Sequence, residues 1–127
     1  MEYLAGIITA LAPIIVAVIS LIKDNKKNKD EITSSIAEIN KKLDDHIRKQ
    51  KEDAALNNRA KILKFNDEIM RHVKHSKESF DNILDIIDNY NEYCKEHPEF
   101  PNSKCLMACE NIHLKYKKCQ EQNDFLK

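Results

Sequence analysis

The sequence predicts an all-α protein with an N-terminal transmembrane helix, a coiled-coil stalk and a small cytoplasmic antiparallel helical bundle. Three observations predict this fold class. The 127 residues include one glycine and three prolines, which leaves few turn residues for a multi-stranded sheet. A continuous apolar segment lies close to the N-terminus. In the remainder of the chain, apolar residues recur at helical spacing.

The apolar segment, residues 4–22, is predicted to cross a membrane. It reads LAGIITALAPIIVAVISLI, in which only Thr9 and Ser20 are polar. At about 1.5 Å per residue, a helix of this length matches the hydrocarbon core of a bilayer, which is about 30 Å thick. The residues before it lack the basic region of a secretory signal peptide. We therefore expect an uncleaved, single-pass anchor in the lipid bilayer.

The next segment, residues 23–30, is a basic juxtamembrane linker. Positively charged residues that flank a span favour the cytoplasmic side of the membrane. We therefore expect the N-terminus outside and the C-terminal domain in the cytoplasm. The residues that set this orientation are Lys23, Lys26, Lys27 and Lys29.

Two patterns predict a homo-oligomer. Within the span, small residues recur at a spacing that suits helix–helix contact in lipid, namely Ala5, Gly6, Thr9, Ala10, Pro13 and Ala17. Residues 31–56 form a predicted coiled-coil stalk, because apolar residues alternate between spacings of four and three. These residues are Ile32, Ile36, Ile39 and Leu43. The stalk pattern weakens beyond Leu43, since His46 and Gln50 fall on the same stripe.

Residues 57–127 are predicted to form a helical hairpin followed by a C-terminal helix. An apolar stripe at helical spacing runs along the hairpin through Ile62, Phe65, Ile69, Val73, Ser76, Phe80, Ile83, Ile87, Tyr90 and Cys94. Residues 59–77 are mainly basic and residues 78–99 mainly acidic. Opposite charge on neighbouring segments favours an antiparallel hairpin that breaks near Ser76 or Ser79, either of which is suited to capping a helix. One long helix remains the alternative, because no glycine or proline marks the turn.

A second helix stop is predicted at EHPEFPNS, where Pro98 disfavours helical geometry at His97. Asn102 or Ser103 is predicted to cap a third helix from about residue 104 to 122. On this helix one face carries Cys105, Ala108, Cys109, Ile112, Tyr116 and Cys119. Helical spacing favours packing of this face in a core, where a free cysteine behaves as a small apolar residue. The alternative is a zinc site formed by Cys94, Cys105, Cys109 and His113.

Composition argues against several function classes. The 21 basic and 21 acidic residues cancel, so no overall field attracts nucleic acid. Phosphate-cradling loops need glycines that this chain lacks, and neither a G-x-S-x-G nor an H-E-x-x-H motif is present. His75 and Ser76 are adjacent but have no identifiable orienting acid or oxyanion donor. We therefore expect neither an enzyme nor a cofactor.

The stretch HSKESFDNILDIIDNYNEYCKEHPEF, together with YKKCQEQNDFL, resembles small proteins of phages and prophages of Firmicutes, some of which carry holin-like labels. The similarity covers residues 58–126 best, and no functional residue carries over. It implies a protein of the host plasma membrane that is holin-like or accessory to lysis or host takeover. Simple holins seldom carry so large a cytoplasmic part. The alternative function is a non-lytic scaffold that recruits a cytoplasmic protein, such as replication machinery, to the membrane.

Overall fold

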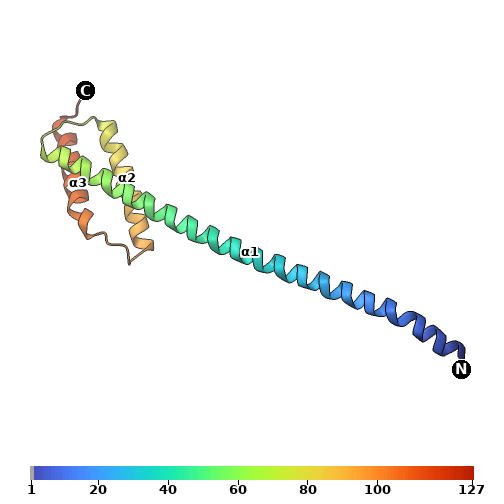
Figure 1. The fold of residues 1–127 in the computed structure, drawn as a ribbon. Coiled ribbons are helices and arrows are strands. Elements are labelled where there is room, and N and C mark those ends of the chain that lie inside the picture. Colours follow the sequence, from blue (N-terminus) through green and yellow to red (C-terminus); the bar gives the residue numbers. More distant parts are fainter. Residues whose placement is uncertain (1) are drawn as a thin grey trace. The chain divides into compact units, whose positions relative to one another are not determined.

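The computed structural model describes the backbone of residues 2–127 and the side chains of residues 9–127. It contains three α-helices, α1 (Glu2–Met70), α2 (Lys77–Glu96) and α3 (Ser103–Gln122) (Figure 1). No strand occurs among the described residues. The predicted all-helical class is thus confirmed. The chain divides into two compact units, residues 1–46 and residues 47–127.

The first unit consists of the N-terminal part of α1. Pro13 lies inside this helix without ending it. Every side chain from residue 9 to residue 46 is exposed. This unit therefore has no core of its own among the described side chains.

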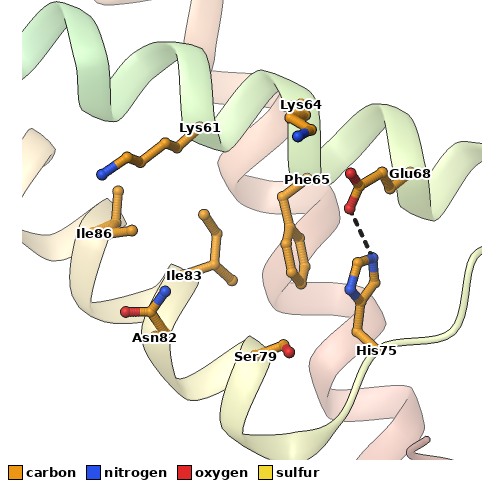
Figure 2. Close-up of a pocket in the computed structure, with 9 residues that line it drawn as sticks. All are labelled: Lys61, Lys64, Phe65, Glu68, His75, Ser79, Asn82, Ile83 and Ile86. Carbon is orange, nitrogen blue, oxygen red and sulfur yellow. Dashed lines mark ion pairs between the residues drawn. The ribbon is translucent and has the colours of Figure 1, made fainter.

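The second unit is a three-helix bundle built from the C-terminal part of α1, α2 and α3. Lys61 on α1 lies near Ile86 on α2, whereas Glu68 lies near His75 just before α2, so the two helices run antiparallel (Figure 2). The Tyr116 hydroxyl near the end of α3 donates to Asp81 near the start of α2 at 3.3 Å, so this pair is antiparallel as well. The hairpin alternative, and not one long helix, describes residues 57–96.

The bundle core combines one apolar face from each helix. The buried residues are Ala55, Ile62, Ile69, Phe80, Ile83, Ile87, Tyr90, Cys94, Phe100, Cys105, Ala108, Cys109, Ile112 and Cys119. Phe80 is 1 % exposed, and its ring lies 5.3 Å from that of Phe65, 5.6 Å from that of Tyr116 and 5.8 Å from that of Phe125. Aromatic rings from all three parts of the bundle therefore meet at Phe80.

The turn between α1 and α2 occupies residues 71–76. His72 adopts a left-handed conformation with φ 63°, which ends the path of α1. Ser76 caps α2, and its hydroxyl accepts a hydrogen bond from the Ser79 N–H at 3.2 Å. The predicted break near Ser76 is confirmed. Val73, which the apolar stripe placed in the core, is instead 46 % exposed because it lies in this turn and not on a helix.

The second unit begins nearer the N-terminus than the predicted residue 57. It starts at Ile47, and Ala55 is buried at 2 % exposure. Arg59 adds contacts in the same region, because its guanidinium lies 5.7 Å from the centre of the Phe100 ring and donates to the Pro101 carbonyl. Part of the segment predicted as stalk, residues 31–56, therefore belongs to the bundle.

The segment between α2 and α3 follows the predicted helix stop. Helix α2 ends at Glu96, two residues before Pro98, with His97 as its C-cap. Asn102 is the N-cap of α3, but its side chain makes no capping hydrogen bond. Helix α3 ends at Gln122 because Asn123 adopts a left-handed conformation with φ 51°. The predicted third helix is confirmed within one residue at its start.

Candidate membrane-anchoring and interaction surfaces

The strongest candidate site is the apolar stretch of α1 that ends at Ile22. Its large apolar side chains are each between 47 and 66 % exposed; they are Leu11, Ile14, Ile15, Val16, Val18, Ile19, Leu21 and Ile22. Successive residues of a helix point in directions about 100° apart, so these side chains cover all of its sides. A helix that is apolar all round is normally covered by protein or by lipid.

Within residues 9–127, whose side chains the structure describes, no helix is long and apolar enough to cross a membrane. The predicted span begins at residue 4, so its first five residues, which include Ala5 and Gly6, lie outside the part whose side chains are described. Of the predicted small-residue stripe, Thr9, Ala10, Pro13 and Ala17 are described, and all four are exposed on α1. The transmembrane helix stays a prediction.

The basic linker follows immediately on the same helix. Lys23, Lys26, Lys27 and Lys29 are all exposed. They lie within two helical turns after the last apolar residue, Ile22, and two acids, Asp24 and Asp30, accompany them. The linker therefore carries a local excess of positive charge where a bilayer surface would lie if residues 4–22 were inserted.

The predicted stalk residues also lie exposed. Ile32 is 61 %, Ile36 53 %, Ile39 63 % and Leu43 53 % exposed. We call these four residues the stalk seam. Their spacing places them on one side of α1, since steps of four and three residues keep a side chain on one helix face. No described side chain of the first unit covers this seam.

The cysteines that suggested a metal site lie in the bundle core. Cys94, Cys105 and Cys109 are buried free thiols, whereas His113 is exposed. Burial, with a contribution from the neighbouring Cys109, raises the pKa of Cys105 to about 12, and burial also raises the pKa of Cys109. Such thiols stay protonated at neutral pH, and the thiolate is the metal-binding and nucleophilic form. Among residues 9–127 no group of three or more histidine, cysteine or acidic side chains is placed to hold a metal ion.

A shallow pocket of about 320 Å³ lies between α1 and α2 (Figure 2). Its polar lining comprises Lys61, Lys64, Glu68, His75, Ser79 and Asn82. The His75 imidazole stacks on the Phe65 ring with centroids 4.1 Å apart, and its Nε2 lies 3.4 Å from Glu68 Oε2. The Ser79 hydroxyl pairs with the Ser76 hydroxyl at 3.0 Å, so both serines belong to the helix cap. The contacts of His75 and Ser79 therefore hold the hairpin turn together. They do not form a pair of nucleophile and base.

One surface of the bundle was not predicted from the sequence. Leu63 and Met70 on α1 are 40 % and 65 % exposed, and Met107 and Leu114 on α3 are 80 % and 67 % exposed. Each pair is separated by seven residues, which places its members on one helix face. We call these four residues the α1/α3 apolar patch. The spacing of seven was visible in the sequence, but the stronger core stripes on the same helices obscured it.

Asparagines join the two halves of this patch. Asn66, which shares a helix face with Leu63 and Met70, accepts a hydrogen bond of 2.6 Å from the side-chain amide of Asn111. The same amide lies 3.7 Å from the sulfur of Met70. Asn111 in turn lies between Met107 and Leu114 on α3. The exposed apolar side chains of α1 and α3 therefore lie on either side of the contact between Asn66 and Asn111 on the bundle surface.

Comparisons of the chain with protein families, with curated proteins and with solved structures found no match. The resemblance to phage and prophage proteins therefore stays a prediction.

Proposed function

We propose that this chain is a single-pass membrane protein that is anchored by residues 4–22 and presents the three-helix bundle to the cytoplasm. The observation that supports the anchor most is the uncovered apolar surface of residues 9–22. Apolar surface gains about 25 cal/mol for each Å² removed from water. A soluble monomer rarely leaves so many large apolar side chains exposed in one stretch, whereas a bilayer would cover all sides of the helix.

The proposed topology places the N-terminus outside and the bundle in the cytoplasm of a bacterial cell. The support is the charge of the linker, where four lysines follow the apolar stretch. The measurement is a pair of C-terminal fusions in a bacterial host. A fluorescent reporter is expected to be active and an alkaline phosphatase fusion inactive, because phosphatase needs the periplasm. Strong phosphatase activity would reverse the orientation.

The first candidate role is an accessory function in host lysis or takeover, of the holin-like kind. Its support is the resemblance of residues 58–126 to phage and prophage proteins. The bundle argues for an accessory role and against a simple pore, because the packed second unit, residues 47–127, exceeds what a pore-forming span needs. Neither catalysis nor a cofactor belongs to this proposal.

The second candidate role is a membrane-bound adaptor for a cytoplasmic protein. The α1/α3 apolar patch favours this role, since exposed apolar side chains flanked by polar ones are typical of protein-binding surfaces. Methionine is common on binding surfaces because its flexible side chain adapts to a partner. A component of the replication machinery is one partner of this kind.

One experiment separates the two roles. The chain is expressed from an inducible promoter while a dye reports the membrane potential, and proteins bound to it are recovered by cross-linking. Collapse of the potential after induction supports the lysis role. An intact potential, with a cross-linked protein that is lost in Met107→Gln/Leu114→Gln and retained in the exposed control Lys117→Gln, supports the adaptor. If the chain inserts in the membrane but causes no collapse of the potential and cross-links no protein, both roles are rejected.

A further inference from the structure

The residue types of the stalk seam indicate how many helices associate through it. Coiled coils place apolar residues at positions a and d of a seven-residue repeat, with three residues from a to d and four from d to the next a. The seam begins with a spacing of four, from Ile32 to Ile36, and continues with three and four. This order assigns Ile32 and Ile39 to position d, and Ile36 and Leu43 to position a.

The residue types at these positions select the number of helices. Leucine at d with a β-branched residue at a favours two-stranded coils, whereas isoleucine at d, with isoleucine or leucine at a, favours three or four strands. Both d positions here are isoleucine, and the a positions are Ile36 and Leu43. The seam therefore has the composition of a coil with more than two strands.

The residues beside the seam agree with this assignment. Positions e and g become more enclosed as strands are added, so small uncharged residues suit them there. Four e and g positions lie between Ile32 and Leu43. Three of them hold small uncharged residues, namely Thr33, Ser35 and Asn40. The Thr33 hydroxyl bonds back to the Lys29 carbonyl at 2.8 Å, which satisfies it within its own helix. The fourth, Lys42, pairs with Glu38 on the outer side at 2.8 Å.

We infer that the stalk seam joins three or four copies of this chain into a parallel coiled coil that ends at His46. The common direction rests on the proposed function, because chains anchored through residues 4–22 in one membrane with one topology approach each other from the same end. His46 occupies the next d position and Gln50 the next a position, so the apolar seam stops there. The occupant of the exposed seam is thus other copies of the same chain.

The test measures the mass of the full chain in detergent micelles by light scattering after size-exclusion chromatography. Three or four copies are expected for the natural chain. The variant Ile32→Leu/Ile39→Leu/Leu43→Ile keeps volume and helicity but places leucine at d and isoleucine at a, and it should form pairs. Ile36→Glu/Ile39→Glu should give single chains. Lys41→Glu, which changes the net charge equally but lies outside the seam, should keep the natural mass.

Specific outcomes overturn the inference. A natural chain that is single or paired contradicts it, and so does a leucine-switched variant that keeps the natural mass, because another surface would then set the number of copies. Membrane fractionation of the same proteins separates this result from failure of the anchor. A chain that stays with washed membranes but forms pairs overturns only the inference. A chain released from membranes overturns the anchor, while its measured mass still decides the number of copies.

Discussion

The two units of this protein differ in how far their apolar side chains are exposed. In residues 9–46 every side chain is exposed, including Ile15 at 56 % and Ile39 at 63 %. In residues 47–127 the stripes that form the core are covered, and Ile62, Ile87 and Ile112 are each 0 % exposed, although the α1/α3 apolar patch stays exposed. The same residue type thus occurs in both units with opposite environments. The difference is whether neighbouring segments of the chain supply a covering face.

The contrast indicates where each unit obtains its stability. Helix formation is cooperative, and in proteins most helical stability comes from packing of an apolar face. In the bundle that face packs against two other helices. In the first unit no described side chain is buried, and we propose that lipid covers residues 9–22 and other copies of the chain cover the stalk seam.

The largest expected effect comes from substitutions that would keep the span of the first unit out of the lipid bilayer. Ile15→Arg places one charge near the middle of the span, where a charge costs about 2.5–3.5 kcal/mol on insertion scales. Ile19→Arg adds a second charge nearer the C-terminal end of the span, where the cost is smaller. We expect the double variant to leave the membrane fraction after a carbonate wash, while the thermal unfolding of the bundle stays unchanged. Ile15→Leu/Ile19→Leu is the matched control and should remain in the membrane. Retention of the arginine variant would contradict the proposed anchor.

The next effect concerns the covered unit. Phe80→Ala removes a ring that is 1 % exposed and in contact with three other aromatic rings, so we expect a loss of about 3–5 kcal/mol in the free energy of unfolding. Met107→Ala, at an apolar position that is 80 % exposed, should change it by less than about 0.5 kcal/mol. Chemical denaturation of residues 47–127, which we expect to fold cooperatively, measures both. Equal losses would mean that exposure does not distinguish the two positions.

Much of the bundle could be predicted because its information is local. The scarcity of glycine and proline indicated helices, and Ser76 and Pro98 marked the boundaries of α2. The spacing of Cys105, Cys109 and Cys119 identified the buried face of α3. Each of these signals depends on a few neighbouring residues whose effect on the backbone is known.

Other features depend on tertiary contacts that periodicity does not report. Phe100 is buried although it lies in the segment between α2 and α3, and Phe125 packs against the core from the C-terminal tail. Val73 continued the apolar stripe but is exposed, because the left-handed residue His72 interrupts the helix. The second unit begins at Ile47, and its first buried residue, Ala55, is too small to stand out in the pattern.

Burial in the bundle also predicts a response to alkaline pH. Burial raises the pKa of Cys105 from its ordinary 9.0 to about 12. A group whose pKa is raised in the folded state contributes stability that is fully present below the unfolded pKa and is lost as pH rises towards the folded pKa. We therefore expect the melting temperature of the bundle to fall between about pH 9 and pH 12.

The replacement Cys105→Ala isolates this contribution. It should lower the melting temperature at neutral pH, because a buried side chain is shortened, but it should make the decline above pH 9 shallower. Some decline should persist, since burial likewise raises the pKa of Tyr90 to about 12. Identical pH profiles for the two proteins would show that the Cys105 thiol titrates alike in the folded and unfolded states.

The smallest expected effect belongs to an exposed contact of the bundle. Lys74 in the turn and Asp124 in the C-terminal tail form an ion pair of 2.6 Å, with side chains 61 % and 45 % exposed. The hydrogen bond and charge of each partner raise the pKa of Lys74 and lower that of Asp124. The contribution of Asp124 is therefore present above its ordinary pKa of 3.8 and is lost as pH falls through the lowered value. Water and salt screen such a pair strongly.

Lys74→Gln tests this contact. At neutral pH and low salt we expect a lower melting temperature, by less than for either Phe80→Ala or Cys105→Ala. The difference from the natural bundle should shrink in high salt and at acidic pH, because both conditions weaken the pair in the natural protein. Lys115 also lowers the pKa of Asp124, so the carboxylate keeps a cationic neighbour in the variant. A loss as large as that of Phe80→Ala, unchanged by salt, would mean that the C-terminal tail is held mainly by this pair and not by Phe125 packed against the core.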